Sequence, residues 1–230
     1  MGIINFWEKY YMNDLVVGNE NPQKNIGRTK SGSPITGEVW KQSIQYIKSQ
    51  IGLKITDDIL EVCCGNGMVV GELSKYCNSA KGIDFSEKLI NQLNENYPNV
   101  SSHLENVLDY NYKSKSYDKV LLYFSAQHFD ETDLLELIQK MLYTTKKNGS
   151  ILIGDIPDES EKWNYISEPN HKVDYFDRIS EGEPMIGKWY SKDWFLALKH
   201  YLRNVDVEII EQPDFMINSD WRFDVLIKKY

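Results

Sequence analysis

The sequence has little cysteine: only three of its 230 residues, Cys63, Cys64 and Cys77. Because two of them are adjacent, we expect free, partly buried thiols in a reducing compartment, not a disulfide framework. Neither a CxxC pair nor a nearby histidine completes the four ligands of a structural zinc site. We therefore predict a protein without a structural metal.

Long apolar runs and an excess of basic residues are also missing. No stretch of about 18 uninterrupted apolar residues occurs, and the N-terminal residues lack the basic and apolar regions of a signal peptide. Asp and Glu outnumber Lys and Arg by 34 to 26, and the resulting net charge of -8 opposes binding to nucleic acid or to an anionic membrane. We expect a cytoplasmic protein that acts on a small molecule, with no nucleic-acid or membrane partner. Nothing in the sequence specifies an oligomeric state.

The residues that are present suffice for one hydrophobic core. Hydrophobic residues make up 41% of the chain, and the length predicts a single domain over residues 1–230. From Asp57 onward, short apolar runs alternate with amphipathic patterns, which is typical of an α/β fold whose mostly parallel sheet has helices on both faces. We expect seven strands, at 59–63, 81–84, 101–104, 118–124, 150–156, 205–210 and 222–228, and helices at 37–51, 69–76, 87–96, 133–143 and 191–201.

A glycine-rich turn follows the first expected strand, in Ile59-Leu-Glu-Val-Cys-Cys-Gly-Asn-Gly-Met68. Gly65 and Gly67 let backbone N–H groups approach a ligand, because no side chain blocks them. Glu61 precedes the turn, and Asp84 ends the next strand, where a carboxylate can accept hydrogen bonds from both hydroxyls of a ribose. The pattern predicts a nucleotide-containing ligand.

These motifs resemble those of the class I methyltransferases that depend on S-adenosylmethionine (SAM). The turn is similar to the family pattern acidic-x-Gly-x-Gly-x-Gly, with Cys63 in place of the first glycine, and Gly82-Ile-Asp-Phe-Ser86 resembles the second family motif. Asn106 lies where the family commonly has an aspartate that contacts the adenine amino group, and its side-chain carbonyl can make the same contact. The segment from Tyr117 to His128 is similar to the fourth family strand and the loop beside the reactive sulfonium.

The resemblance is close over residues 55–157. It implies a doubly wound, Rossmann-like fold with an antiparallel last strand, SAM as cofactor and S-adenosylhomocysteine (SAH) as product. A Rossmann-fold dehydrogenase is disfavoured, because its Gly-x-Gly-x-x-Gly pattern would need glycine at Val70. The residues implied to bind the cofactor are Glu61, Cys63, Gly65, Gly67, Asp84, Phe85, Asn106, Val107 and Phe124.

Around this core we distinguish three further regions. Residues 1–54 form an N-terminal loop and helix cap, with a Gly-, Pro- and Asn-rich stretch over 19–34 that reads as a long loop. Residues 158–190 are rich in acidic and aromatic residues without a clear period, and we expect a substrate-side insert or lid there. Residues 191–230 supply the C-terminal helix and strands.

Methyl transfer from a sulfonium requires alignment of donor and acceptor and, for a hydroxyl acceptor, removal of a proton. His128 is the candidate base, because it follows the fourth strand and has an ordinary pKa near 6.5. The alternative is that it only orders the loop. Asp155, at the end of the fifth strand, is a candidate substrate anchor, with proton abstraction as a less favoured role.

Further residues are candidates for contact with the acceptor. Arg28 could offer two parallel hydrogen bonds to a carboxylate or phosphate, unless it is a solvated charge on a loop. His171 could reach the site from the insert, or be a solvated loop histidine. The candidate substrate-binding residues are Arg28, Tyr11, Gln127, Asp155 and His171.

The aromatic insert would suit a sugar ring or a flat metabolite, which favours O-methylation of a small polar metabolite or sugar-type precursor. N-methylation of a small amine is the alternative within the same class. A protein that binds SAM without catalysis is the alternative from another class.

Overall fold

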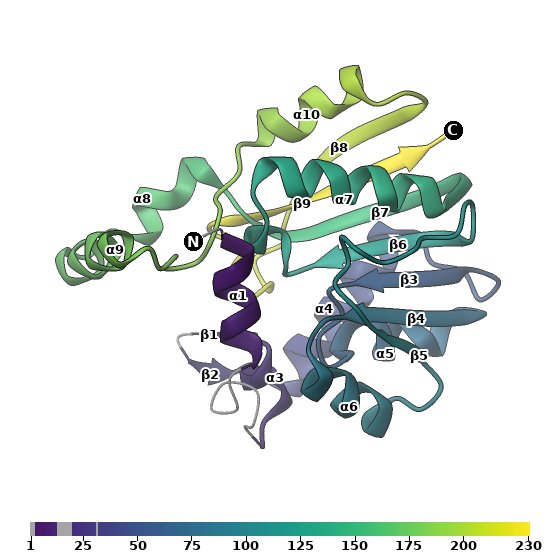
Figure 1. Ribbon diagram of the computed structural model, residues 1–230, viewed down its shortest axis with the longest axis horizontal. Helices are drawn as coiled ribbons and strands as arrows, with labels where there is room; N and C mark the ends of the chain where they lie inside the picture. Colours follow the sequence, from purple (N-terminus) through teal and green to yellow (C-terminus); the bar gives the residue numbers. More distant parts are fainter. Residues whose placement is uncertain (1–2, 13–19, 31) are drawn as a thin grey trace.

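The computed structural model describes residues 3–12, 20–30 and 32–230. Its main sheet has seven strands in the order β5-β4-β3-β6-β7-β9-β8, shown in Figure 1. β9 is antiparallel to both of its neighbours, and the other pairs are parallel. This confirms the predicted fold, including the antiparallel last strand. The strands are β3 (Asp58–Val62), β4 (Ser79–Asp84), β5 (Ser101–Leu104), β6 (Tyr117–Tyr123), β7 (Thr145–Pro157), β8 (Val205–Glu211) and β9 (Arg222–Lys229).

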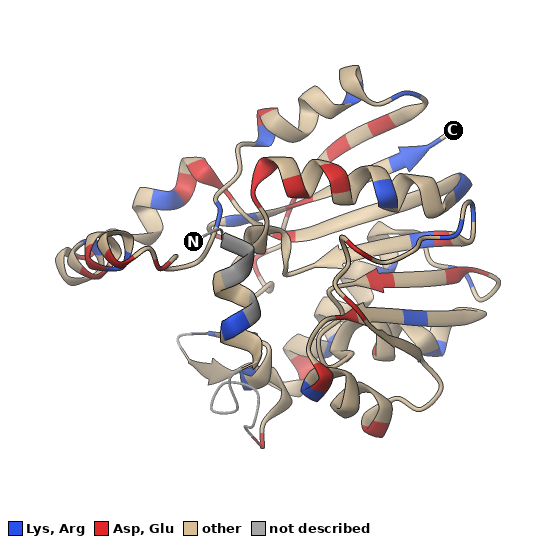
Figure 2. Ribbon diagram, in the orientation of Figure 1, with Lys and Arg blue, Asp and Glu red and all other residues tan. Residues whose placement is uncertain are grey.

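Helices cover both faces of the sheet because apolar side chains of the strands alternate between the faces. On one face, Leu122 and Ile153 pack in a cluster with α7 (Glu131–Thr144) and α10 (Lys192–Tyr201). On the other, Leu121 and Leu152 pack with helices α4 (Gly37–Gln50), α5 (Met68–Leu73) and α6 (Glu87–Asn96). Figure 2 shows that charged residues are scarce in the middle of β7, as burial on both faces requires.

The predicted core elements are confirmed, with α6 and β5 at their expected bounds. α5 is shorter than expected because a 3-10 turn, η1 (Ser74–Tyr76), follows it. β7 begins earlier than expected because Thr145 already pairs with Tyr117 of β6. Ser191 caps α10 by accepting a hydrogen bond from the N–H of Trp194.

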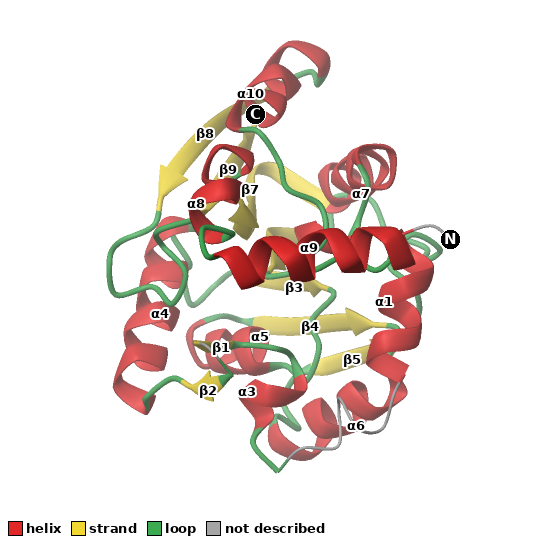
Figure 3. Cartoon of the chain, turned by 90° about the vertical axis from the view of Figure 1, so that its left-hand side faces the viewer, coloured by secondary structure: helices red, strands yellow, loops and turns green. Residues whose placement is uncertain are grey.

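Further elements lie at the carboxyl ends of the parallel strands, on the side of the molecule that is turned toward the viewer in Figure 3. The stretch expected as a loop over 19–34 instead contains a short helix, α3 (Pro22–Asn25), and a two-stranded hairpin of β1 (Thr29–Lys30) and β2 (Ser33–Pro34). The residues among 19–34 that the structure describes are thus partly regular. The N-terminal helix is α1 (Ile3–Met12), and the 3-10 turns η2 (Ala126–His128) and η3 (Glu159–Glu161) follow β6 and β7.

The insert is also more regular than we predicted. It contains α8 (Lys162–Tyr165) and α9 (Pro169–Glu181), and no residue of either helix is buried. Pro169 opens α9, and Gly182 ends it in a left-handed conformation with φ 74°. Val173, Phe176 and Ile179 recur at helical spacing along α9 and are exposed, so the sequence carries a helical period that the prediction missed.

Three strand ends carry backbone conformations that are rare for side-chain-bearing residues. Cys63 follows β3, Phe124 follows β6 and Asp155 lies near the end of β7, with φ values of 54°, 66° and 61°. At Asp155 this accompanies a shift in the β7–β9 register between Ile153 and Ile156. Such conformations cost free energy and cluster at functional sites. They direct attention to this edge of the sheet. Over the described part of the chain, no helix combines the length and apolar character needed to cross a membrane.

Candidate active site

The glycine-rich turn joins β3 to α5 in the way the sequence predicts. Gly65 and Gly67 have φ values of 54° and 78°, which glycine adopts without strain. Gly67 is the N-cap of α5. A Cβ atom at this position would come within 2.7 Å of Leu93 Cγ. Gly67 therefore permits close packing of the turn on α6.

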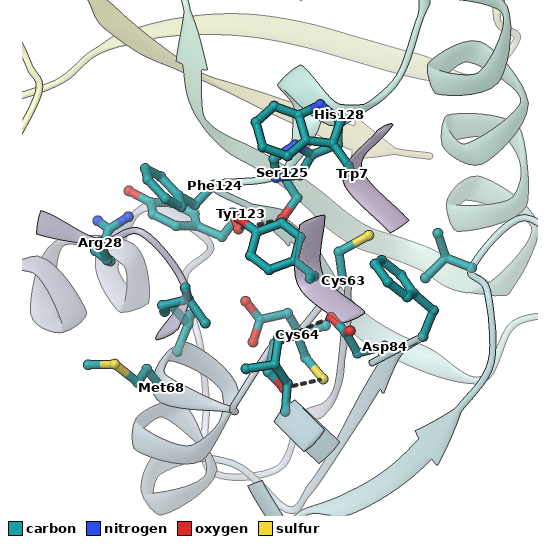
Figure 4. Close-up of a pocket in the computed structure, with 18 of the residues that line it drawn as sticks. Trp7, Arg28, Cys63, Cys64, Met68, Asp84, Tyr123, Phe124, Ser125 and His128 are labelled. Atoms are coloured by element: carbon teal, nitrogen blue, oxygen red, sulfur yellow. Dashed lines mark hydrogen bonds between the residues drawn. The ribbon is translucent and has the colours of Figure 1, made fainter. Parts of the chain in front are cut away.

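A first cavity opens beside this turn and encloses about 860 Å³ of space, its open mouth included. It lies at the carboxyl ends of β3, β4 and β6, and Figure 4 shows its lining side chains. The lining residues are Trp7, Tyr11, Ile26, Arg28, Glu61, Cys63, Cys64, Gly65, Met68, Val69, Asp84, Phe85, Leu89, Asn106, Val107, Tyr123, Phe124, Ser125, His128 and Phe129.

Two buried carboxyl groups shape the floor of the first cavity. Asp84 accepts hydrogen bonds from the N–H groups of Gly65 (2.8 Å) and Ser86 (2.9 Å), and burial raises its pKa to about 6. A carboxylate has about four acceptor positions, so it keeps capacity for a ligand. Glu61 accepts from the N–H of Val70 at 2.9 Å, and burial raises its pKa to about 8, so it is predominantly protonated at neutral pH.

The other end of the first cavity is mostly apolar. Phe85, Leu89 and Val107 line it together with Asn106. The Asn106 Oδ1 atom accepts a hydrogen bond from the N–H of Leu108 at 3.0 Å, which fixes the orientation of the amide. Apolar surfaces with one oriented amide suit a flat heteroaromatic base.

A second cavity adjoins the first and encloses about 1140 Å³ of space, again with its open mouth. Trp7, Tyr11, Phe124 and His128 line both cavities and thus form a shared wall. The second cavity is lined further by Tyr10, Gly27, Thr29, Lys30, Gly32, Gln127, Tyr165, Met185, Ile186, Ile217, Asn218, Asp220, Trp221 and Arg222.

His128 lies in this shared wall. Its ring centroid is 4.3 Å from that of Trp7 and 5.6 Å from that of Tyr11. The Nδ1 atom is buried and has no hydrogen-bond partner among the described residues. Burial, together with the charge of Arg222, lowers the pKa of His128 to about 3. The imidazole is therefore neutral at physiological pH, which is the form that can accept a proton.

A buried ionic cluster lies behind the shared wall. Arg28 donates from Nη1 to Asp155 Oδ2 at 3.2 Å, and Arg222 donates from Nη1 to the backbone oxygen of Asp155. The exposed fraction of the side chain is 1% for Arg28, 3% for Arg222 and 0% for Asp155. The guanidinium carbons of Arg28 and Arg222 lie 5.0 and 4.9 Å from the ring centroid of Phe124. Phe124 thus contacts both cations.

Most of the sequence-predicted site residues come together around the two cavities. Those on their walls are Tyr11, Arg28, Glu61, Cys63, Gly65, Asp84, Phe85, Asn106, Val107, Phe124, Gln127 and His128.

Three other predicted residues lie on neither wall. Gly67 packs on Leu93, and Asp155 is enclosed by its two arginines. His171 is exposed on α9. The reading of Arg28 as a solvated charge is wrong, because the side chain is almost fully buried.

Several wall residues were not identified as candidates from the sequence. Trp221 and Arg222 line the second cavity, but the sequence marks Arg222 only as the start of the last strand. Tyr165, from the aromatic insert, lines the same cavity. The sequence signal that could have identified Trp221 and Arg222 is an arginine next to a tryptophan at the beginning of a core strand. Within 3–12, 20–30 and 32–230, no group of three or more His, Cys, Asp or Glu residues is placed to hold a metal ion.

Comparison with known proteins relates this architecture to one kind of domain. Residues 59–149 match a family model described as a methyltransferase domain. The match spans the region from β3 to the turn before the buried half of β7, which includes the glycine-rich turn and most of the first cavity. No curated protein sequence matches the chain.

Solved structures share the fold at low sequence identity. A SAM-dependent methyltransferase of Methanosarcina mazei is 17% identical, with a TM-score of 0.61 and coverage of 80% of this chain and 96% of that one. The plantazolicin methyltransferase BpumL, solved with a desmethylplantazolicin analogue and SAH, is 15% identical, with a TM-score of 0.64 and 98% coverage of both chains. A phosphoethanolamine N-methyltransferase of Haemonchus contortus, solved with phosphoethanolamine and SAH, is 13% identical, with a TM-score of 0.67 and coverage of 99% of this chain but 49% of that one.

Proposed function

We propose that the chain transfers the methyl group of SAM to a small molecule bound in the second cavity, since residues 59–149 match a methyltransferase domain and the sheet has the predicted strand arrangement. The observation that carries the proposal is the pair of adjoining cavities with one shared wall. Donor and acceptor in neighbouring chambers would meet where Trp7, Tyr11, Phe124 and His128 line both. Alignment of this kind is the main source of rate in a displacement reaction.

The residues of the first cavity fit SAM. Asp84 would accept hydrogen bonds from the ribose hydroxyls, and Asn106 with Phe85 and Val107 would hold the adenine. Arg28 and Tyr123 also line this cavity, and the Nε and Nη2 atoms of Arg28 and the hydroxyl of Tyr123 are buried without a hydrogen-bond partner among the described residues. These atoms would suit the polar methionine end of the cofactor. When bound, SAM supplies the electrophilic methyl group.

His128 is the proposed proton acceptor for a hydroxyl acceptor. Its ring is held by Trp7 and Tyr11, and its neutral form is available at physiological pH. Tyr11 and Gln127 would contact the acceptor, because both line the second cavity. Asp155 would not contact the acceptor but would orient Arg28 and Arg222. O-methylation of a small polar metabolite is the reaction that this arrangement supports best.

N-methylation of a small amine is the second candidate. The low pKa makes His128 a weak base, and a neutral amine already presents a lone pair and needs no base to attack. The two reactions predict different behaviour of a His128→Ala variant. O-methylation would lose about 100-fold in rate or more, whereas N-methylation of a neutral amine would change little.

The experiment that tests the proposed function begins with SAH, whose binding is measured by calorimetry. The protein is then incubated with methyl-labelled SAM and a metabolite extract, and labelled products are separated. Binding of SAH with transfer of label supports the proposal, and the product shows which atom was methylated. Binding of SAH without transfer to any component of extracts from several sources would favour a SAM-binding protein without catalysis. Failure of SAH to bind would refute both.

A further inference from the structure

The second cavity has an arginine whose hydrogen-bonding capacity is only partly used. Arg222 lines the cavity, is 4% exposed and has its Nε atom buried without a hydrogen-bond partner among the described residues. Its ion-pair partner, Asp155, lies 3.7 Å from Nη1 and is shared with Arg28, which approaches the same carboxylate to 3.2 Å. Two buried guanidinium groups thus share one carboxylate.

The neighbouring carboxylate, that of Asp224, does not supply a second ion pair to the two arginines. Asp224 accepts hydrogen bonds from the N–H of Asp155 at 2.7 Å and from the side-chain amide of Gln212 at 2.6 Å. No ion pair joins it to Arg28 or Arg222 within the described residues. A buried charge normally has a partner for each of its donors, so Arg222 has capacity for a further anion.

The surroundings of Arg222 match an acid with a flat or apolar body. The Trp221 ring centroid lies 4.2 Å from the guanidinium carbon, and the Tyr165 ring centroid lies 4.4 Å from that of Trp221. Ile186 and Ile217 add apolar wall, and Lys30, which is exposed, adds a second cation at the rim. Among the described residues of this wall, the one carboxylate is Asp220, which is also exposed.

We propose that the second cavity binds a methyl acceptor with an anionic group, a carboxylate or a phosphate, which pairs with Arg222 and with Lys30, while its body packs against Trp221 and Tyr165. The assignment of this ligand as the methyl acceptor rests on the proposed function. The planar guanidinium can offer two parallel hydrogen bonds to either group. An anion there would also offset the charge of Arg222, which contributes to the lowered pKa of His128, and so make the imidazole a better proton acceptor.

The test measures the affinity of SAH-saturated protein for matched probes by calorimetry. The anionic probes are 4-hydroxybenzoate and phenyl phosphate, and their neutral counterparts are 4-hydroxybenzamide and phenol. We expect each acid to bind about 10- to 100-fold more tightly than its neutral counterpart, the range for a hydrogen-bonded charge pair. The ratio between the two acids then shows which anion the site prefers. Equal affinity of acids and neutral probes would overturn the proposal.

Two variants locate the preference. Arg222→Gln should reduce the preference for acids to less than about threefold, and Lys30→Gln should reduce it in part, with SAH binding retained in Arg222→Gln and unchanged in Lys30→Gln. The control for Arg222→Gln is Arg203→Gln, which is exposed just before the start of β8 and so lies at the end of the sheet away from the cavities. The control for Lys30→Gln is Lys24→Gln, which is exposed in α3 and lines neither cavity. If both Arg222→Gln and Lys30→Gln kept the full preference, the anion would lie elsewhere and the proposal would be wrong.

Arg222 is buried, so Arg222→Gln is first checked by circular dichroism. If it does not fold, the wild-type preference and Lys30→Gln, which is on the surface, still decide the question. Failure of the proposed function has a different signature, because SAH would then not bind or no label would be transferred, whatever the probes do. Binding of SAH with label transfer but no preference for acids would overturn only the inference about the acceptor.

Discussion

Replacing Asp84 by alanine removes a buried carboxylate from the floor of the first cavity. Each oxygen already accepts one backbone N–H, from Gly65 at 2.8 Å and Ser86 at 2.9 Å, and we propose that the remaining acceptor positions take the ribose hydroxyls of SAM. Loss of a hydrogen bond to a charged group costs about 1.5 to 3 kcal/mol. The Kd for SAH should therefore rise by about 10- to 150-fold. Asp84→Asn, which keeps one carbonyl oxygen, should lie at the lower end.

The same carboxylate predicts the pH dependence of cofactor binding. Burial raises the pKa of Asp84 to about 6, and only the ionised form can accept hydrogen bonds from both hydroxyls while it also accepts the two backbone N–H groups. The Kd for SAH should be constant above pH 7 and should rise by up to about tenfold per unit as the pH falls below 6. In Asp84→Asn this rise should be absent.

Calorimetric titration with SAH at pH 5.0 to 8.0 checks both expectations, with folding verified by thermal melting. Asp177→Ala serves as the control, because Asp177 is exposed on α9 and lines neither cavity. A folded Asp84→Ala protein that binds SAH as tightly as the wild type would refute the placement of the ribose. A Kd that is flat between pH 7.5 and 5 would refute the role of the ionised carboxylate.

Three further predictions concern other parts of the molecule. His128→Ala should lower turnover of a hydroxyl acceptor by about 100-fold or more with the Kd for SAH unchanged, and near-normal turnover in this variant would contradict its role as base. Because burial lowers the wild-type pKa to about 3, the wild-type rate should show no histidine titration near pH 6.5. Gly67→Ala should lower the free energy of unfolding in urea by about 1 to 3 kcal/mol more than Gly52→Ala, because a Cβ at Gly67 meets Leu93 while none of the surroundings of Gly52 lies within 4 Å. SAH should slow proteolysis within residues 20–34, since Arg28 lines the first cavity, and identical cleavage with and without SAH would count against cofactor contact by this segment.

The core of the fold was predictable because its signals are local. Strands buried on both faces show as short apolar runs, and helices such as α6 show a period near 3.6 residues with a proline soon after their end. The glycine-rich turn and Asp84 follow from the same alternation, because parallel strands present their carboxyl ends at one edge of the sheet. This is why the predicted cofactor residues, apart from Gly67, line one cavity.

The second cavity was less predictable because its walls come from distant segments. Lys30 of β1, Tyr165 of α8 and Arg222 of β9 all line it, and no local period links segments so far apart in the chain. The sequence marks Arg222 only as the start of the last strand. α9 was missed although its apolar residues Val173, Phe176 and Ile179 recur at helical spacing, and in the structure all three are exposed.

The wall shared by the two cavities has a consequence for the order of events in a catalytic cycle. Trp7 and Tyr11 of α1 border both chambers, so a displacement of this helix that admits one ligand also loosens the enclosure of the other. Entry of cofactor and departure of product would therefore pass through a common opening step.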